Sequence, residues 1–419
     1  MRRVLVNDHS GHAFPVQLSR YLARNGYEII HTFSKSFQAP KGPLEQRDND
    51  SKNLKIKGIE LSKPFQKYSY VKRRFQEREY GLLLADIIKS FQPEIIISNN
   101  TPLYAQSIIQ NISLSVNSKF VFWVQDLYSI AIRNVLSKKV PYLGRLLSHY
   151  FKKMEQKQLL NSDRVVLITE DFLPLMKSWE IDIAKCSVIP NWAPIDDLPI
   201  LPKINPWSLN KGLHDKTCIV YSGTLGLKHN PELLVRAADH FKSVTDVRII
   251  VVSEGLGADY LKSRRKELNL NNLLIMNYQP FELLPAVLST ADILISVLEP
   301  EAGFFSVPSK VFTYLCFNKP LILAVPKENL ASRIVKENNA GILVDPSDAK
   351  ELIAQIDDLL SNPAKRKTLG ENAYRYAEKH FDIEKIGNSF EKIIIELMEE
   401  NKSNLISRAK FLTFNHYKS

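Results

Sequence analysis

The stretch EAGFFSVPSKVFTYL (301–315) combines residue types that bind a phosphorylated ligand. Glu301 supplies a carboxylate, Gly303 lets the backbone approach a ligand closely, and Ser309 and Lys310 supply a hydroxyl and a cation. The last two fall at the predicted start of an amphipathic helix, where backbone N–H groups without helical partners bind anions. A lysine at that positive end is unfavourable by roughly 0.3–1 kcal/mol. Lys310 is therefore either a ligand-binding cation or a solvated residue of the first helical turn.

Two further turns in the same half of the chain favour phosphate. In YSGTLGLKHNPELL (221–234) a predicted strand passes through Gly223 into a helix, and Lys228 supplies a cation. This turn lacks the Gly-Lys-Ser/Thr ending of a Walker motif, and SEGLGADY (253–260) lacks the third glycine of a dinucleotide fingerprint. Each turn alone is a weak signal, but three such turns in one predicted domain indicate a site for a nucleoside diphosphate.

Two loops in the first half of the chain carry polar residues directly after predicted strands. NDHSGHAF (7–14) contains Gly11 and two histidines three positions apart. It fits a polar cleft loop, an ordinary turn or, least well because no third ligand is near, a metal site. In WVQDLYS (123–129), Asp126 is either a base or orienting group for a substrate hydroxyl, or a carboxylate that caps the following helix.

The composition is that of an ordinary globular protein: 419 residues, 44% hydrophobic and 24% charged, a length that suggests about two domains. The formal net charge of +11 favours anionic partners such as nucleic acid, acidic lipid or a phosphorylated substrate. Three isolated cysteines without a CxxC motif argue against a disulfide framework or a zinc site and indicate buried thiols in a reducing compartment. The first apolar run is too short for a signal peptide, and none is long enough to span a membrane. We therefore expect a protein in the cytosol or on the cytosolic face of a membrane.

Short β-branched apolar runs alternate with helical patterns along almost the whole chain. The alternation predicts two tandem domains, each with a parallel sheet covered by helices on both faces. A proline-rich stretch without a regular period (191–207) connects them. The predicted boundaries are 1–199 for the first domain, 200–382 for the second, and 383–419 for a C-terminal helix and basic tail that can return to the first domain.

The predicted strands locate the candidate loops. In doubly wound domains ligands bind beyond the carboxyl ends of the strands, so two such domains would place these loops across a shared cleft. The last helix is expected at about 384–400, before the basic tail. The strands are predicted at 4–6, 28–30, 94–98, 120–125, 164–169 and 187–190, and then at 218–223, 247–253, 273–279, 291–297, 320–325 and 341–344.

The ordered motifs VIPNW, YSGTLGLKHNP, SEG, NYQP, ADILISV, E-x-G-F, PSKVFTYL and KPLI resemble the carboxyl-terminal half of the retaining glycosyltransferases of family 4. The segment SGHAFPVQLSRYLARNGYEI is similar to the glycine loop and helix of that family's acceptor domain. The resemblance covers nearly the whole chain. It implies an α/β chain with the GT-B fold: two Rossmann-like, doubly wound parallel-sheet domains facing a cleft, the second of which binds a nucleotide-sugar. It also implies retention at the anomeric carbon, without a metal or other cofactor.

The chain departs from the family pattern at two donor-loop positions. The family usually has an arginine where Thr224 stands, whereas Lys228 matches the family's lysine. Glu301 matches the first of two glutamates, and Ser309 replaces the second, as in a Pro-Ser-Lys subgroup that includes enzymes of bacterial surface-polysaccharide synthesis. We hypothesise that Lys310 replaces the missing arginine as a contact to the diphosphate.

Carried over residue by residue, the resemblance implies roles for a set of site residues. Glu301, Asp126 and Lys228 are the expected catalytic residues, and His12 and Asp126 are expected on the acceptor side. The expected donor-binding residues, which include the segment that usually positions the base (278–280), are Gly11, Gly223, Thr224, Lys228, Glu254, Gly255, Tyr278, Gln279, Pro280, Gly303, Phe304, Phe305, Ser309 and Lys310.

Two basic segments interleaved with aromatic residues (63–78 and 136–157) lie in the acceptor half. No nucleic-acid-binding motif accompanies them, and the second fits either an anionic membrane surface or a solvated helical surface. We expect a UDP-sugar donor and a hydroxyl acceptor, such as a lipid-linked saccharide, with the protein peripheral on the inner membrane. The alternatives are a nucleotide-sugar epimerase or phosphorylase of the same fold, and a non-catalytic scaffold, which Thr224 and Ser309 favour.

Overall fold

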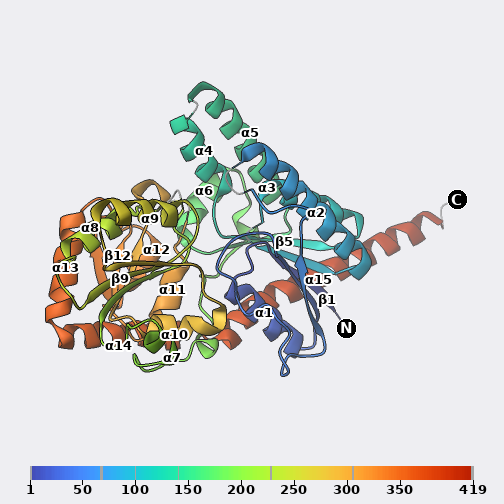
Figure 1. The fold of residues 1–419 in the computed structure, drawn as a ribbon. Coiled ribbons are helices and arrows are strands. Elements are labelled where there is room, and N and C mark those ends of the chain that lie inside the picture. Colours follow the sequence, from blue (N-terminus) through green and yellow to red (C-terminus); the bar gives the residue numbers. More distant parts are fainter. Residues whose placement is uncertain are drawn as a thin grey trace.

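The computed structural model describes residues 2–66, 69–99, 101–139, 141–226, 229–303 and 306–416. Two α/β domains lie side by side, one built from the first half of the chain and one from the second (Figure 1). Each contains one parallel sheet with helices packed on it. The prediction of two Rossmann-like, parallel-sheet domains is therefore confirmed.

The N-terminal sheet has seven parallel strands in the order β3-β2-β1-β4-β5-β6-β7. Its central strands are almost entirely buried, as expected for apolar runs covered on both faces. The strands are β1 (Arg3–Asp8), β2 (Glu28–Ser34), β3 (Leu54–Ile59), β4 (Ile95–Asn99), β5 (Lys119–Val124), β6 (Arg164–Leu167) and β7 (Cys186–Val188). The helices are α1 (Ala13–Arg24), α2 (Tyr70–Phe91), α3 (Leu103–Ser115), α4 (Tyr128–Lys139), α5 (Pro141–Leu160) and α6 (Leu173–Ser178).

The C-terminal sheet has six parallel strands in the order β10-β9-β8-β11-β12-β13. The strands are β8 (Thr217–Ser222), β9 (Val247–Val252), β10 (Leu273–Met276), β11 (Ile293–Val297), β12 (Leu321–Ala324) and β13 (Gly341–Val344). The helices are α7 (Pro206–Asn210), α8 (Glu232–His240), α9 (Leu256–Leu268), α10 (Leu284–Ser289), α11 (Lys310–Leu315), α12 (Leu330–Glu337), α13 (Ala349–Ser361) and α14 (Pro363–His380). In both sheets the strand order reverses beside the first strand of the domain, which creates a topological switch point between β1 and β4 and between β8 and β11.

One strand was not predicted. β3 reads LKIKGI and pairs with β2 at the edge of the N-terminal sheet, with Lys55 and Lys57 exposed. Its alternating lysines make the run too polar to resemble the buried strands, although charged residues are typical of a sheet edge, where they oppose pairing with another chain.

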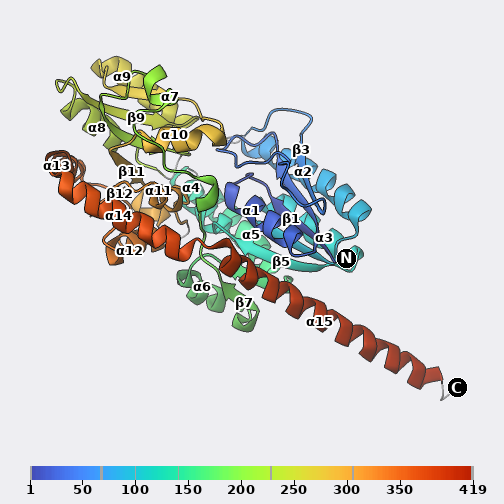
Figure 2. The same cartoon turned by 90° about the horizontal axis from the view of Figure 1, so that it is seen from below.

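The last helix runs from the C-terminal domain onto the N-terminal domain. α15 (Ile383–His416) leaves the C-terminal domain and packs on α1 of the N-terminal domain, then continues beyond it (Figure 2). Gly387 allows this close approach, because a Cβ there would lie 2.4 Å from the Tyr21 ring. The Tyr21 hydroxyl donates to Asn388 Oδ1 at 2.7 Å. The expected end near residue 400 is wrong, since the helix continues to His416.

An aromatic cluster fixes the connection between the domains to the N-terminal core. Trp192 stacks on Trp123, and Phe390 of α15 packs against both rings. The Trp192 indole N–H donates to Gln17 Oε1 at 2.7 Å. The proline-rich connection is thus anchored before it enters the second domain.

Two expectations from composition can be compared with the described residues. Cys218 and Cys316 are buried as predicted, but Cys186 on β7 is only partly buried. Among the helices that the structure describes, none has both the length and the apolar character needed to cross a membrane.

Candidate active site

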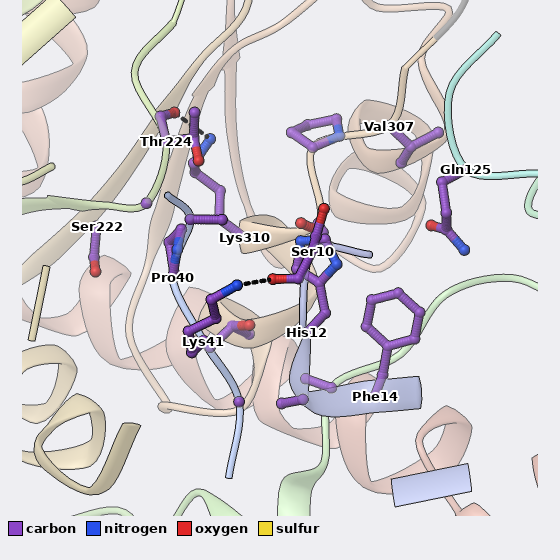
Figure 3. A pocket seen from close by; sticks show the side chains of 18 of the residues that line it. Ser10, His12, Phe14, Pro40, Lys41, Gln125, Ser222, Thr224, Val307 and Lys310 are labelled. Atoms are coloured by element: carbon purple, nitrogen blue, oxygen red, sulfur yellow. Dashed lines mark hydrogen bonds between the residues drawn. The ribbon is translucent and has the colours of Figure 1, made fainter. Parts of the chain in front are cut away.

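A cavity of about 380 Å³ lies between the two domains, where the loops after several strands meet (Figure 3). The N-terminal domain contributes the loops after β1, β2 and β5, and the C-terminal domain contributes the loop after β8 and the start of α11. These loops follow the carboxyl ends of their strands, the edge where ligands bind in doubly wound domains.

Asp8 organises the loop after β1. Its buried carboxylate accepts the backbone N–H groups of Ser10 and His12 and the side-chain amide of Asn99. Burial alone would raise the pKa of Asp8, but the charge and hydrogen bonds of His12 outweigh it and hold the pKa below its usual value. Gly11 has a φ of +74°, and a Cβ there would lie 2.8 Å from Leu44, so the turn requires glycine. The polar cleft loop expected at 7–14 is therefore present, although Gly11 itself does not line the cavity.

The two histidines of this loop lie in different surroundings. His9 is packed against the rings of Phe37, Phe65 and Tyr80, and burial lowers the pKa of its imidazole to about 3. His12 lines the cavity, with its Nδ1 3.7 Å from Asp8 Oδ2. Within the described residues, no three His, Cys, Asp or Glu side chains are grouped closely enough to hold a metal ion. The loop therefore presents a half-buried His12 to the cleft and keeps His9, which also borders the cavity, buried and neutral.

Lys41 lies in the cavity wall opposite the C-terminal domain. Its ammonium donates to the backbone oxygens of Ser10 (2.9 Å) and Ser34 (2.8 Å), and Figure 3 shows the first of these bonds. Burial lowers the pKa of Lys41 to about 8, although the nearby Asp8 opposes the shift. A cation is therefore built into the N-terminal wall of the cavity.

Asp126 follows β5 and lines the cavity, as do Gln125 before it and Tyr128 after it. The carboxylate that accepts the first backbone N–H groups of α4, from Tyr128 and Ser129, belongs to Glu155 at 2.8 and 2.9 Å. Burial raises the pKa of Glu155 to about 7. Because Glu155 accepts these N–H groups, the geometry favours a role for Asp126 in the cleft.

The C-terminal wall is formed by the turn after β8 and the first residue of α11. Gly223 and Thr224 line the cavity beside Lys310. The Lys310 Nζ lies 3.5 Å from the Thr224 backbone oxygen, 4.9 Å from the centre of the Tyr221 ring and 3.4 Å from His229 Nε2. The sequence placed Lys310 and Gly223 in separate turns, and the structure brings them into contact.

A second group of expected donor-binding residues lies beside the cavity rather than in its wall. Glu254 accepts the backbone N–H of Tyr278 at 3.1 Å, and the Tyr278 hydroxyl donates to Thr224 Oγ1 at 3.4 Å. Gln38 of the N-terminal domain also donates to Glu254, so this carboxylate joins the two domains. Gly255 is the residue before α9 and has a φ of +88°. Gln279 accepts a hydrogen bond from the Trp207 indole at 3.4 Å, and Pro280 is exposed.

The stretch 301–315 is divided by the structure. Ser309 lines the cavity and is the first residue before α11, whereas Glu301 and Gly303 do not line it. Glu301 is exposed, and its backbone oxygen accepts a 3.4 Å bond from Asn134 of the N-terminal domain. Lys228, Phe304 and Phe305 lie outside the described residues.

Sequence reasoning missed Lys41, Arg73 and His229 in the cavity wall, and it missed Asp8, which holds the loop after β1 from beneath. Asp8 and His229 stand within loops that were already singled out, so the available signal was a polar side chain three positions from a glycine of the loop. Lys41 and Arg73 carry no such signal, because one lies in an irregular loop and the other in a basic helix.

Residues 207–376 match the family of glycosyl transferases group 1. The Escherichia coli (strain K12) protein WcaI, provisionally named as a colanic acid biosynthesis glycosyl transferase, is 24% identical over 308 residues, which are 72% of this chain and 74% of that protein.

The chain is also similar in structure to known glycosyltransferases. Sucrose-phosphate synthase from Thermosynechococcus elongatus aligns with a TM-score of 0.71 at 17% identity, over 96% of this chain and 100% of that one. HepE from Anabaena, solved in complex with UDP-glucose, aligns with a TM-score of 0.69 at 15% identity, over 94% and 100%. At these identities the likeness shows the GT-B fold.

Proposed function

Because residues 207–376 match the group 1 glycosyl transferases and the whole chain has the GT-B fold, we propose that this protein transfers a sugar from a UDP-sugar to a hydroxyl acceptor. The observation that carries the proposal is the cavity between the domains, where Lys310 and Gly223 face a wall that contains His12 and Asp126. One wall thus offers a phosphate site, and the other offers polar groups for an alcohol.

In this proposal the C-terminal wall holds the donor. Lys310 contacts the diphosphate and stabilises the charge that develops on it as the bond to the sugar breaks. Lys228 and Glu301 are assigned their roles, a second cation and a ligand of the sugar hydroxyls, from the resemblance alone. No metal or cofactor is required, since lysine ammonium groups supply the positive charge.

The N-terminal wall holds the acceptor. His12, fixed by Asp8, and Asp126 hydrogen-bond the acceptor hydroxyl and orient it toward the anomeric carbon. The acceptor oxygen forms the new bond to that carbon, and its proton passes to the departing diphosphate oxygen. Retention is proposed on the strength of the family resemblance.

A basic and apolar surface beside the acceptor wall supports a lipid-linked acceptor. On α2, Val71, Phe75 and Leu82 are more than half exposed. They are interleaved with exposed Lys72 and Arg78, and this helix also supplies Arg73 to the cavity wall. Exposed apolar side chains among cations fit an anionic membrane surface.

Helix α5, which packs on the other side of α3, carries similar exposed side chains. Leu146 is 71% exposed and lies beside Arg145, and the only acidic residue of α5, Glu155, is buried. Tyr104 of α3 links the two helices, because the Arg74 guanidinium lies 5.0 Å over its ring and Phe151 packs against it at 6.0 Å. We call the exposed side chains of these two helices the α2–α5 surface.

The donor is tested by thermal shift and calorimetry of the full chain with UDP, UDP-sugars and the corresponding GDP compounds. Binding should raise the melting temperature for the correct nucleotide. An assay for UDP release should show slow hydrolysis of the donor and faster release with an acceptor. Conversion of the sugar without an acceptor would indicate an epimerase, and absence of binding to every nucleotide would indicate a scaffold.

The acceptor surface is tested by flotation with vesicles of phosphatidylglycerol or of phosphatidylcholine alone. The protein should float with the anionic vesicles, and Phe75→Ser should weaken this binding because the side chain is 66% exposed on the α2–α5 surface. Leu209→Ser is the matched control, since Leu209 is 51% exposed on α7 of the other domain. Equal binding to both kinds of vesicle, or equal loss in both variants, would contradict the assignment.

A further inference from the structure

His229 faces Lys310 in the C-terminal wall of the cavity. It is 5% exposed, lines the cavity, and its Nε2 lies 3.4 Å from the Lys310 Nζ. The other ring nitrogen, Nδ1, accepts the backbone N–H of Gly226 at 3.1 Å. A backbone N–H can only donate, so Nδ1 carries a lone pair and the proton of the ring is on Nε2.

Lys310, opposite His229, is held in place by its packing against Gly223 and Tyr221. Its stem crosses Gly223, where a Cβ would lie 2.8 Å from Lys310 Cε, and its ammonium lies over the Tyr221 ring. The ammonium group has donors and no acceptor. Two hydrogen-bond donors, an Nε2–H and an ammonium, are therefore directed at the same part of the cavity wall, an arrangement complementary to the oxygens of an anion.

We propose that His229 and Lys310 together bind one phosphoryl group of the donor. The inference rests on the proposed function and adds a residue to it: His229 donates a neutral hydrogen bond from Nε2, and Lys310 supplies the charge. The bond from Gly226 sets the tautomer, much as a second partner orients a histidine at a metal site. His229 is thus a binding residue for the leaving diphosphate, which it would stabilise together with Lys310 as the sugar departs.

The test compares UDP with uridine on the full chain, by calorimetry or by competition. His229→Phe should weaken UDP binding about tenfold, the loss expected for one hydrogen bond to a charged group, and leave uridine binding unchanged. His229→Gln should retain most of the affinity, because its amide nitrogen can take the place of Nε2. His240→Phe is the matched control, since His240 is exposed at the end of α8, outside the cavity wall.

A double-mutant cycle with Lys310→Met tests whether the two residues share one phosphate. The combined loss should differ from the sum of the single losses, because contacting partners are coupled. Equal losses for UDP and uridine in His229→Phe, or no loss for UDP, would overturn the inference while the proposed function stands. Failure of the unaltered protein to bind any nucleotide would instead overturn the proposed function.

Discussion

Lys310 lies directly across the backbone of Gly223, so closely that a Cβ at position 223 would be 2.8 Å from Lys310 Cε. Gly223 follows β8 and Lys310 begins α11, and the two are 87 positions apart in the chain. Two features require glycine at position 223. One is this close contact, and the other is its φ of +133°, a conformation that residues with a side chain rarely adopt. The position of the cation in the cleft therefore depends on the absence of a side chain at residue 223.

Gly223→Ala should accordingly impair nucleotide binding as well as stability. The new methyl group displaces Lys310 from the cavity wall, so we expect UDP affinity to fall about tenfold or more, comparable to the loss of a charge-assisted contact. Backbone strain should lower the free energy of unfolding by about 1–3 kcal/mol. Calorimetry with UDP and thermal unfolding measure the two effects.

Gly212→Ala provides the matched control for this variant. Gly212 has a φ of +61°, but no atom lies within 4 Å of a Cβ built on it. The substitution should therefore lower stability through backbone strain and leave UDP affinity unchanged. A similar loss of affinity in both variants would show that binding responds to stability alone.

Lys310→Met separates the charge of this residue from its packing. Methionine keeps an unbranched apolar stem over Gly223 and Tyr221 but removes the ammonium group. We expect UDP affinity to fall about tenfold and to become less sensitive to salt, because an ionic contact is lost. Lys327→Met, at a position whose side chain is 85% exposed, should change neither quantity. Unaltered UDP binding in Lys310→Met would refute the proposed contact.

The alternation of apolar runs and helices was enough to predict both sheets, since the buried parallel strands contain apolar runs rich in β-branched residues, such as IIISN in β4 and VRIIVV in β9. The edge strand β3 escaped prediction because its lysines interrupt that pattern. The length of α15 also escaped it: the basic composition after residue 400 suggested a tail, whereas the backbone continues as a helix to His416.

The candidate site was predictable where a functional residue follows a strand. β8 and β11 are neighbours in the sheet, so the turns after them had to meet, which brings Lys310 to Gly223. The sequence did not predict which side chains of these loops point into the cavity. Glu301 lies in the same loop as Ser309 and yet is outside the cavity wall, because a short 3-10 helix (Pro300–Ala302) places it at the surface. Lys41 reaches the cavity through an irregular loop whose path no local pattern encodes.

The hydrogen bond from Gln38 to Glu254 predicts a variant that affects turnover more than donor binding. The bond joins the loop after β2 of the N-terminal domain to the C-terminal domain. The other carboxylate oxygen of Glu254 accepts the backbone N–H of Tyr278. Gln38→Ala should loosen this contact between the domains and lower the rate of UDP release severalfold, while UDP affinity stays within about twofold, because Gln38 does not line the donor wall.

Gln66→Ala is the control for this effect, because Gln66 is also an exposed glutamine of the N-terminal domain and its side-chain amide donates a local bond to the backbone oxygen of Pro64. Turnover and affinity should both be unchanged in this variant. A Gln38→Ala protein that turns over at the original rate would show that this contact between the domains does not contribute to turnover.

Lys41 predicts how stability depends on pH. Burial lowers its pKa to about 8 from the 10.5 of an exposed lysine, so between these values the unfolded chain holds a proton that the native protein has released. Stability must therefore rise with pH across this range, by about 2 kcal/mol between pH 7 and 9.5. Lys41→Met should lack that increment, whereas Lys57→Met, on the exposed edge strand, should keep it. Chemical denaturation of the three proteins at several pH values measures the difference, and parallel pH profiles for the original protein and Lys41→Met would contradict the assignment.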